Sequence, residues 1–226
     1  MDNEFLNIDC MEYMKSLNNN SIDLVLTDIP YDGVNDNDDS GGLRKLNKSK
    51  ADIITFDLEN FLNEIYRITK GTTIIFCGNS QMSEIYNFFK QKKDFTTRQL
   101  IWEKTNPSPM NGELFYLSGI ENAVYAKKRG GTFNGFCQNC VFRYPSGSSE
   151  LHPTEKNHNL LKRLINDNSN IGDVVFDPCA GSGSTLLCAN ECGRKYIGCE
   201  LDTEFYKKAK ERLDAETAQT TIFDFL

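Results

Sequence analysis

The stretch DVVFDPCAGSGST, residues 173–185, has the pattern of a strand, a glycine-rich turn and the start of a helix. Glycines at such a turn let the backbone bend sharply and approach a ligand closely. A phosphate-binding P-loop would carry a lysine at the end of the loop, and none is present. A dinucleotide fingerprint would place a third glycine where Leu186 stands. The stretch therefore predicts a ligand-binding turn that is poorly suited to a pyrophosphate.

The next strand-like run, KYIGCE at 195–200, ends in an acid, Glu200. An acid at the end of the second strand of a βαβ unit can accept hydrogen bonds from both hydroxyls of a ribose. Together with Asp177 and a loop without basic residues, it suits a nucleoside with a cationic tail, such as S-adenosylmethionine. Taken alone, the same residues also fit a tight strand–helix turn followed by an exposed acid.

Strand-like and helix-like segments alternate along the whole chain. We expect strands at 22–28, 72–77, 98–103, 120–126, 173–177 and 195–200, and helices at 57–69, 80–90, 157–167, 184–192 and 203–213. Several of the strands are apolar without alternation, as in sheets that are covered on both faces. The pattern predicts a single α/β domain over 1–226, with a mostly parallel sheet and helices on both faces.

Two segments do not follow this alternation. Residues 32–50 are polar and rich in Gly and Asn, and we expect a flexible loop that is disordered in the absence of a partner. Residues 129–151 mix glycines, aromatic residues and arginine, and we expect a short irregular insertion that contacts a partner.

Composition limits the class of protein. The 226 residues are 39% hydrophobic and 25% charged, which is an ordinary globular balance. No apolar run approaches the roughly 18 residues that a membrane span needs, and the acidic start is no secretory signal, so we expect a cytoplasmic protein. The net charge of −7 argues against non-specific coating of nucleic acid, although a local basic groove is compatible with it. Cys137 and Cys140 lack a second cysteine pair, so no metal site is expected.

A second signal is IDLVLTDIPY, residues 22–31. An apolar strand here delivers a carboxylate (Asp28), the dipeptide Ile29-Pro30 and an aromatic ring (Tyr31) to its carboxyl end. That edge of an open α/β sheet is where ligands bind.

Four motifs together resemble those of the DNA amino-methyltransferases. Asp28-Ile29-Pro30-Tyr31 resembles their Asp-Pro-Pro-Tyr tetrapeptide, and DPCAGSGST at 177–185 resembles their S-adenosylmethionine loop. HPTEK at 152–156 resembles their HPTxKP stretch, and residues 8–14 resemble their amino-terminal segment. Ile29 replaces the usual first proline, and Asn157 replaces the proline that often closes HPTxKP.

The order of these motifs, with the tetrapeptide first and the cofactor loop last, resembles the circularly permuted β class. The resemblance implies a Rossmann-like methyltransferase fold, with a seven-stranded, mostly parallel sheet that contains one antiparallel strand. Residues 129–151 fall where that class carries its target-recognition segment.

The resemblance also implies a reaction: transfer of a methyl group from S-adenosylmethionine to the N6 of adenine in double-stranded DNA, on a base turned out of the duplex. Asp28 and the Ile29 carbonyl would accept the two amino hydrogens, Pro30 would keep Ile29 extended, and Tyr31 would stack on the base. The implied cofactor-binding residues are Asp9, Thr154, Lys156, Asp177, Cys179, Gly181, Gly183, Ser184, Thr185 and Glu200. Among these, Asp9 would face the adenine, Glu200 the ribose, and Thr154 and Lys156 the methionine end.

Two other functions compete with this one. Cytosine-N4 methylation is the near alternative, because the same residues can hold either amino group. The alternative from another class is a catalytically idle S-adenosylmethionine-binding module that regulates a partner. The short insertion at 129–151 leaves little protein to surround DNA, so we expect a homodimer or a partner subunit. No cognate restriction nuclease is inferred.

Overall fold

The computed structural model describes residues 2–31, 55–109, 112–114, 116–146 and 155–223, and the side chains of the last of these ranges as far as 217. The loop expected at 32–50, Thr154 and the last part of the 129–151 insertion lie outside the described residues. The elements are β1 (Glu4–Asn7), α1 (Cys10–Ser16), β2 (Ile22–Asp28), α2 (Leu58–Ile68), β3 (Thr69–Cys77), α3 (Asn79–Lys90), β4 (Phe95–Lys104), β5 (Ile120–Lys128), β6 (Val141–Tyr144), α4 (His158–Asn168), β7 (Val174–Asp177), α5 (Ser184–Glu191), β8 (Lys195–Glu200) and α6 (Thr203–Phe223).

The described strands form one sheet in the order β1-β8-β7-β2-β3-β5-β4-β6. Neighbouring strands are parallel except where β5 pairs with β3 and β4, so β5 is the antiparallel strand. The mostly parallel α/β fold is confirmed. The described strands number eight, one more than the seven that the family resemblance implies; β1 and β6 are the two strands outside the six ranges expected from the sequence, and β6 pairs in parallel with β4. This four-residue strand lies inside the 129–151 insertion. Trp102 of β4 anchors it, because its Nε1 donates to the Tyr144 carbonyl at 2.9 Å.

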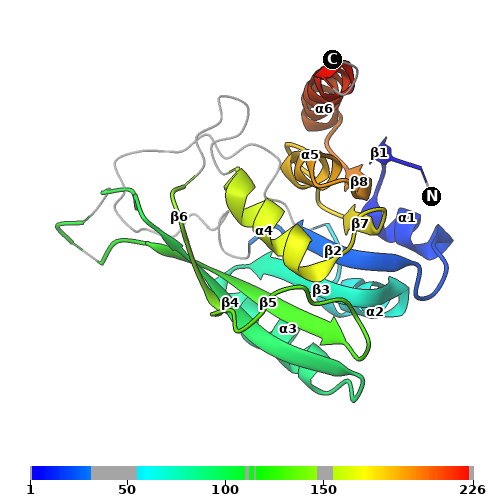
Figure 1. The fold of residues 1–226 in the computed structure, drawn as a ribbon. Coiled ribbons are helices and arrows are strands. Elements are labelled where there is room, and N and C mark those ends of the chain that lie inside the picture. Colours follow the sequence, from blue (N-terminus) through cyan, green and yellow to red (C-terminus); the bar gives the residue numbers. More distant parts are fainter. Residues whose placement is uncertain (1, 32–54, 110–111, 115, 147–154, 224–226) are drawn as a thin grey trace.

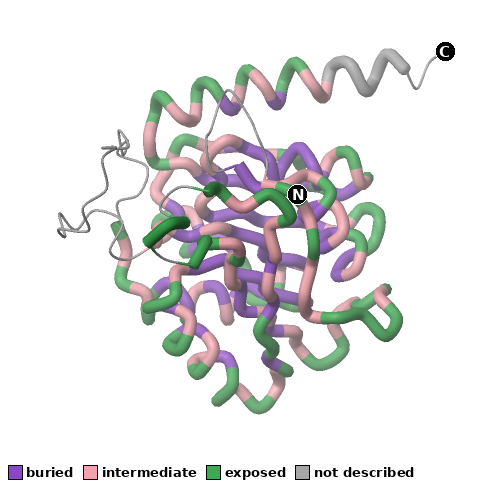
Figure 2. The backbone as a smooth tube through the Cα atoms, turned by 90° about the vertical axis from the view of Figure 1, so that its left-hand side faces the viewer, coloured by how far each residue is buried: buried purple, intermediate pink, exposed green. Residues whose placement is uncertain are grey.

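Helices cover both faces of the sheet (Figure 1). Helices α4, α5 and α6 pack on one face and α1, α2 and α3 on the other, each group with its own apolar cluster. Successive side chains of β2 alternate between the two clusters: Leu24 and Leu26 join the first, and Val25 joins the second. This explains why β2 reads as an uninterrupted apolar run. Figure 2 shows the buried residues concentrated in the strands and in the helix faces that touch them.

Local sequence accounts for the helix starts. Asp57 caps α2, as its side chain accepts a hydrogen bond from the Asn60 N–H at 2.9 Å. Helix α1 was not expected. It has only seven residues and is anchored by Asp9, whose Oδ1 accepts from the Met11 N–H at 2.7 Å and from the Glu12 N–H at 3.3 Å. No described helix has both the length and the apolar character of a membrane span.

The middle of the sheet contains a topological switch point. Strand β7 leads outward to β8 on one side, and β2 leads outward to β3 on the other. The chain connections therefore diverge beyond the carboxyl ends of β7 and β2, which opens a crevice at that edge. Open α/β sheets bind their ligands in such a crevice.

Candidate active site

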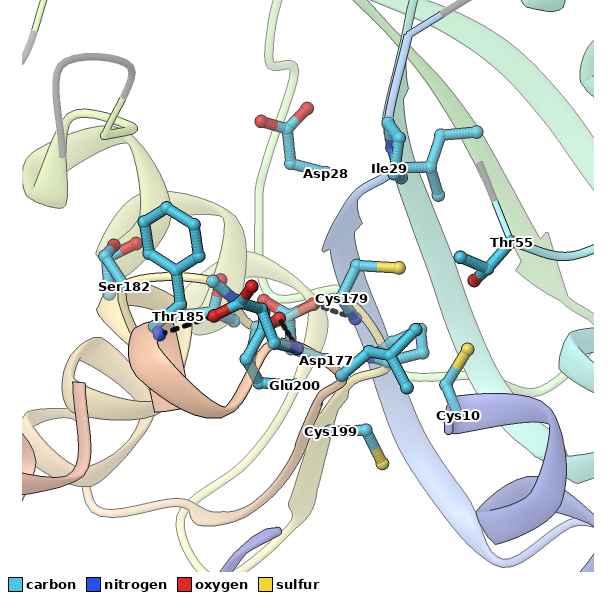
Figure 3. A pocket seen from close by; sticks show the side chains of 18 of the residues that line it. Cys10, Asp28, Ile29, Thr55, Asp177, Cys179, Ser182, Thr185, Cys199 and Glu200 are labelled. Carbon is cyan, nitrogen blue, oxygen red and sulfur yellow. Dashed lines mark hydrogen bonds between the residues drawn. The ribbon is translucent and has the colours of Figure 1, made fainter. Parts of the chain in front are cut away.

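A cleft of about 510 Å³ lies at this switch point. It is formed by the carboxyl ends of β2, β7 and β8, the start of α1, the start of β5, the segment before α4 and the first turn of α6. Figure 3 shows lining side chains from three of these strands: Asp28 of β2, Asp177 of β7 and Glu200 of β8. The volume is typical of a small-molecule or cofactor site.

The glycine loop has the conformation that its sequence predicts. Gly181 and Gly183 have φ angles of 51° and 74°, in the left-handed region that glycine adopts without strain. Gly183 is the N-cap of α5, and Ser184 and Thr185 form the buried first residues of that helix. At Gly181 a Cβ atom would meet nothing within 4 Å, so the glycine serves the backbone angle and leaves open space at the cleft.

Glu200 holds this loop against the end of β8. Its Oε2 accepts a hydrogen bond from the Gly181 N–H at 2.9 Å, and its Oε1 accepts from the Asp202 N–H at 2.8 Å (Figure 3). Burial raises the pKa of Glu200, and the two N–H donors oppose this effect. Each carboxylate oxygen has a second lone pair, so Glu200 can still accept hydrogen bonds from a diol.

Asp177 forms the floor of the cleft. It is 3% exposed, and burial raises its pKa to about 6, although the Cys179 N–H donates to its Oδ1 at 3.1 Å. The Cys10 thiol and burial raise the pKa of Cys179, and burial raises that of Cys199. Both cysteines are therefore neutral thiols at physiological pH and are not activated nucleophiles.

The tetrapeptide after β2 is fixed from both sides. The Ile29 side chain packs in the core, and its N–H donates to the Phe76 carbonyl at 3.2 Å. The Pro30 carbonyl accepts from Gln81 Nε2 at 2.9 Å. Tyr31 lies against Gly78, where an added Cβ would come within 3.3 Å of the Tyr31 Cβ. The side chain of Ile29 thus faces away from the chemistry, which limits this residue to a backbone role.

Lys156 lies beside Asp28. Its Nζ donates to Asp28 Oδ2 at 2.5 Å and to Glu121 Oε2 at 2.7 Å, and it lies 3.4 Å from the Tyr31 hydroxyl. Burial raises the pKa of Asp28, although Lys156 opposes it. The other oxygen, Asp28 Oδ1, is buried and has no hydrogen-bond partner among the described residues. A buried acceptor without a partner is costly, and such a group points to a donor supplied by a ligand.

The structure brings together every described residue that the sequence proposed for the site. Asp9, Asp28, Ile29, Pro30, Tyr31, Lys156 and the proposed residues from β7, its loop and β8 line the cleft; among the described residues of the proposed set, Gly183 alone is outside the lining, and it caps α5. Asp9 has the additional role of capping α1, which the sequence analysis did not assign. Thr154 lies outside the described residues.

Sequence reasoning missed Glu121, Glu155, Asp202 and Phe205, which also line the cleft. The missed signal for Glu121 is topological. Because β5 is antiparallel to its neighbours, its first residues lie at the edge where the other strands end. An acid at the start of an antiparallel strand is therefore a site candidate in the same way as an acid at the end of a parallel one.

The charge of the lining limits its ligand. Seven acidic side chains and one lysine line the described part of the cleft. This arrangement suits a cationic or neutral polar ligand and disfavours phosphates. Among the described residues, no group of three or more His, Cys, Asp or Glu has the arrangement of a metal site.

The sequence of this chain is similar to those of known DNA methyltransferases. A family model described as DNA methylase, for N6 and N4 methyltransferases, matches residues 22–135 and 125–211. The type II methyltransferase M.HinfI of Haemophilus influenzae is 30% identical over 93% of this chain and 69% of its own length. The DNA adenine methyltransferase YhdJ of Escherichia coli is 28% identical over 91% of this chain and 81% of its own.

Among solved structures, the chain is similar to the M1.HpyAVI–SAM complex. The two share 26% of their residues and superpose with a TM-score of 0.70, over 92% of this chain and 98% of the other. The similarity covers nearly all of both chains.

Proposed function

This chain belongs to the N6 and N4 DNA methylase family and is an S-adenosylmethionine-dependent DNA methyltransferase, and we propose that its target atom is the exocyclic N6 of adenine. One observation carries the proposal. The Asp28 carboxylate, with a buried oxygen that lacks a partner among the described residues, lines the same cleft as the glycine loop and Glu200. An adenine methyltransferase among the relatives supports the choice of base. A substrate of cellular DNA also implies that the protein works in the cytoplasm.

The cleft fits S-adenosylmethionine by the chemistry of its donor groups. Its acidic lining suits a cation, and its loop has no basic residue to hold a phosphate. Glu200 would accept the ribose hydroxyls, and the left-handed glycines would let the loop backbone approach the ligand. Asp9, Asp177, Cys179, Ser184 and Thr185 would shape the rest of the pocket. When bound, this cofactor supplies a methyl group on a sulfonium, which is a good leaving group.

The tetrapeptide would prepare the amino nitrogen. An exocyclic amino group is a weak nucleophile because its lone pair is delocalised into the ring. Asp28 and the Ile29 carbonyl would accept its two hydrogens and so favour a pyramidal nitrogen with a directed lone pair. Positioning and electrostatics of this kind supply most of the acceleration in such reactions. The raised pKa of Asp28, caused by burial, also suits this carboxylate to accept the proton that the nitrogen releases.

The target base would have to leave the duplex to reach Asp28. Tyr31 would then stack on the extruded ring. Burial raises the pKa of Tyr31, so it stays a neutral phenol with an aromatic face available for stacking. The contacts of Thr154 and Lys156 with the methionine end of the cofactor remain predictions from the sequence.

A homodimer would complete the DNA-binding surface. Part of the short 129–151 insertion forms β6 and extends the sheet, so few of its described residues are left to surround a duplex. Sedimentation of the full chain with its DNA substrate tests this point. A sedimentation coefficient that corresponds to one protein chain per duplex would contradict the homodimer.

The reaction is tested by nucleoside mass spectrometry. Purified protein is incubated with unmethylated double-stranded DNA and methyl-labelled S-adenosylmethionine, and the DNA is then digested. We expect labelled N6-methyldeoxyadenosine from the unmodified chain and none from Asp28→Ala, with cofactor binding retained in both. Detection of labelled N4-methyldeoxycytidine would show that the target base is cytosine and not adenine. Cofactor binding without label on either base, and without an effect of Asp28→Ala, would favour the idle regulatory module.

A further inference from the structure

Four charged side chains form an alternating row beside the cleft. Asp28 Oδ2 accepts from Lys156 Nζ at 2.5 Å, Lys156 Nζ donates to Glu121 Oε2 at 2.7 Å, and Glu121 Oε1 accepts from Lys104 Nζ at 2.6 Å. These residues come from β2, the segment before α4, β5 and β4. The Lys156 side chain is 8% exposed and that of Glu121 is 19% exposed. The middle of the row is therefore shielded from water and the charges there are weakly screened, whereas the Asp28 side chain at its end is 35% exposed.

The pair formed by Asp28 and Lys156 creates an electrostatic difficulty for methyl transfer. A carboxylate with a lysine ammonium at 2.5 Å has no net charge as a unit. The proposed reaction brings a cationic methyl donor to the cleft and places positive charge on the target nitrogen. A neutral pair would stabilise that charge much less than a free carboxylate would. Something else must therefore supply negative charge near Asp28.

We propose that Glu121 is a positioning residue that holds Lys156 and restores the net negative charge that Lys156 cancels at Asp28. The inference rests on the proposed function, because it concerns the charge that this reaction requires. Glu121 acts through the Lys156 ammonium, which it contacts at 2.7 Å. With Glu121 included, the three charges nearest Asp28 in the row are two carboxylates and one ammonium, and Lys104, which pairs with Glu121, stands at the far end of the row from Asp28.

The geometry around Glu121 supports a specific role. The antiparallel strand β5 places Glu121 opposite Trp102 of β4, and its two oxygens contact two different lysines. Burial by itself would raise the pKa of Glu121, but Lys156 and Lys104 outweigh it, so the pKa is lowered and the charge is kept. Glu103, on the neighbouring strand, offers a contrast. Its partner is Arg143, and the two side chains are 42% and 71% exposed.

The predicted effect on Asp28 depends on the charged and titratable groups that face it in the described part of the chain. These are Lys156 before α4, Glu121 on β5, Tyr31 after β2, Cys77 on β3 and Asp177 on β7, with Lys104 on β4 behind Glu121. Of these, Glu121 raises the pKa of Asp28 and Lys156 lowers it. Removal of the Glu121 charge should therefore lower the pKa of Asp28, and removal of the Lys104 charge should raise it.

The test compares three variants of the full chain: Glu121→Gln, Lys104→Gln and, as a matched control, Glu103→Gln. Each is checked for native circular dichroism and thermal unfolding. Three sets of quantities are then measured: kcat and KM for methyl transfer to DNA, the Asp28 pKa by carboxyl carbon NMR, and the affinities for S-adenosylmethionine and for S-adenosylhomocysteine, which lacks the sulfonium charge.

For Glu121→Gln we expect kcat to fall by about tenfold to a hundredfold. Removal of a charged or polar group that touches the reacting atoms costs about a hundredfold or more, and Glu121 acts on them only through Lys156. The Asp28 pKa should fall, and the preference for the sulfonium cofactor over the thioether product should weaken. Lys104→Gln should raise the Asp28 pKa. Glu103→Gln should leave all three quantities unchanged. If the two substitutions only loosened the site, Glu121→Gln and Lys104→Gln would instead shift the Asp28 pKa in the same direction.

The inference is overturned if Glu121→Gln matches Glu103→Gln, or if Glu121→Gln and Lys104→Gln shift the Asp28 pKa in the same direction. If Glu121→Gln does not fold, the opposite sign expected for Lys104→Gln still decides the question. Absence of methyl transfer by the unmodified chain would instead overturn the proposed function. The Asp28 pKa comparison would then still decide whether Glu121 sets the charge at Asp28.

Discussion

The Gly181 N–H donates to Glu200 Oε2 at 2.9 Å, and this bond fastens the glycine loop after β7 to the end of β8. The same carboxylate is the group proposed to bind the cofactor ribose. Loop position and ligand binding therefore depend on one side chain.

This linkage gives a prediction for Gly181→Ala. A Cβ at Gly181 would meet no atom within 4 Å, so the cost comes from the φ of 51°, at about 1–2 kcal/mol. Gly172→Ala is the matched control, because Gly172 has a φ of 85° and equally open space but lies outside the cleft. Both variants should lose similar stability in thermal unfolding, and calorimetric titration should show weaker S-adenosylmethionine binding only for Gly181→Ala. Equal binding by both variants would contradict a ligand role for the loop.

Asp177→Asn should stabilise the protein at neutral pH. Burial raises the pKa of Asp177 from 3.8 to about 6, so between these values the folded state holds a proton that the unfolded state has released. Its contribution to stability is therefore greatest at low pH and is lost as the pH rises toward 6. At pH 8 the buried charge of Asp177 therefore lowers the free energy of unfolding by about 3 kcal/mol. Denaturant unfolding at pH 4 and pH 8 measures this difference.

Asn at position 177 keeps an oxygen that can accept the Cys179 N–H and carries no charge. The gain in stability should thus be large at pH 8 and small at pH 4. We expect weaker cofactor binding in the same variant, because Asp177 lies at the base of the glycine loop that is proposed to hold the cofactor. A gain that is equal at both pH values would show that the buried charge is not the cause.

Asp28→Asn should abolish turnover and leave cofactor affinity nearly unchanged. Asn keeps the size of the side chain, but its NH₂ group can face the amino hydrogens that the carboxylate would accept. Asp57→Asn is the control: it alters the cap of α2, whose side chain bonds to the Asn60 N–H, and should keep full activity. Single-turnover methyl transfer and equilibrium binding separate the two steps. Substantial activity in Asp28→Asn would remove this residue from the reaction.

Arg212→Ala should destabilise the protein by about 2–4 kcal/mol. Arg212 Nη1 donates to Glu155 Oε1 at 2.6 Å, and the Glu155 side chain is buried beside His158. Loss of one partner of a buried ion pair is costly. The control is Lys210→Ala on the same helix, where the exposed pair with Asp214 is worth at most about 1 kcal/mol. Denaturant unfolding of the two variants distinguishes these values, and equal losses would contradict the special role of the buried pair.

The Arg212 contact also fixes the chain next to Lys156. Because Glu155 precedes Lys156, release of Glu155 should loosen the ammonium that contacts Asp28. Arg212→Ala should therefore also reduce kcat, whereas Lys210→Ala should not. Unchanged kcat in a folded Arg212→Ala protein would show that Lys156 is held by Asp28 and Glu121 alone.

The sequence by itself determined the features that depend on neighbours along the chain. The left-handed turn at Gly181 and Gly183, the cap at Asp57 and the apolar strand before Asp28 all follow from local backbone preference and side-chain pattern. These features, in their order, were enough to predict the fold class and the two halves of the site. The short elements β1, α1 and β6 were missed, because four, seven and four residues carry too little periodic pattern to stand out.

Only the tertiary structure decided how the charges of the site are arranged. Asp28, Glu121 and Lys156 are far apart in the chain, and they meet because the antiparallel β5 brings its first residues to the edge where β2 ends. Strand order and direction depend on long-range pairing, which leaves no local pattern in the sequence. For this reason the sequence could propose Asp28 as the catalytic carboxylate and Lys156 as a cofactor contact, while the contacts of Lys156 with Asp28 and with Glu121 appeared only in the folded protein.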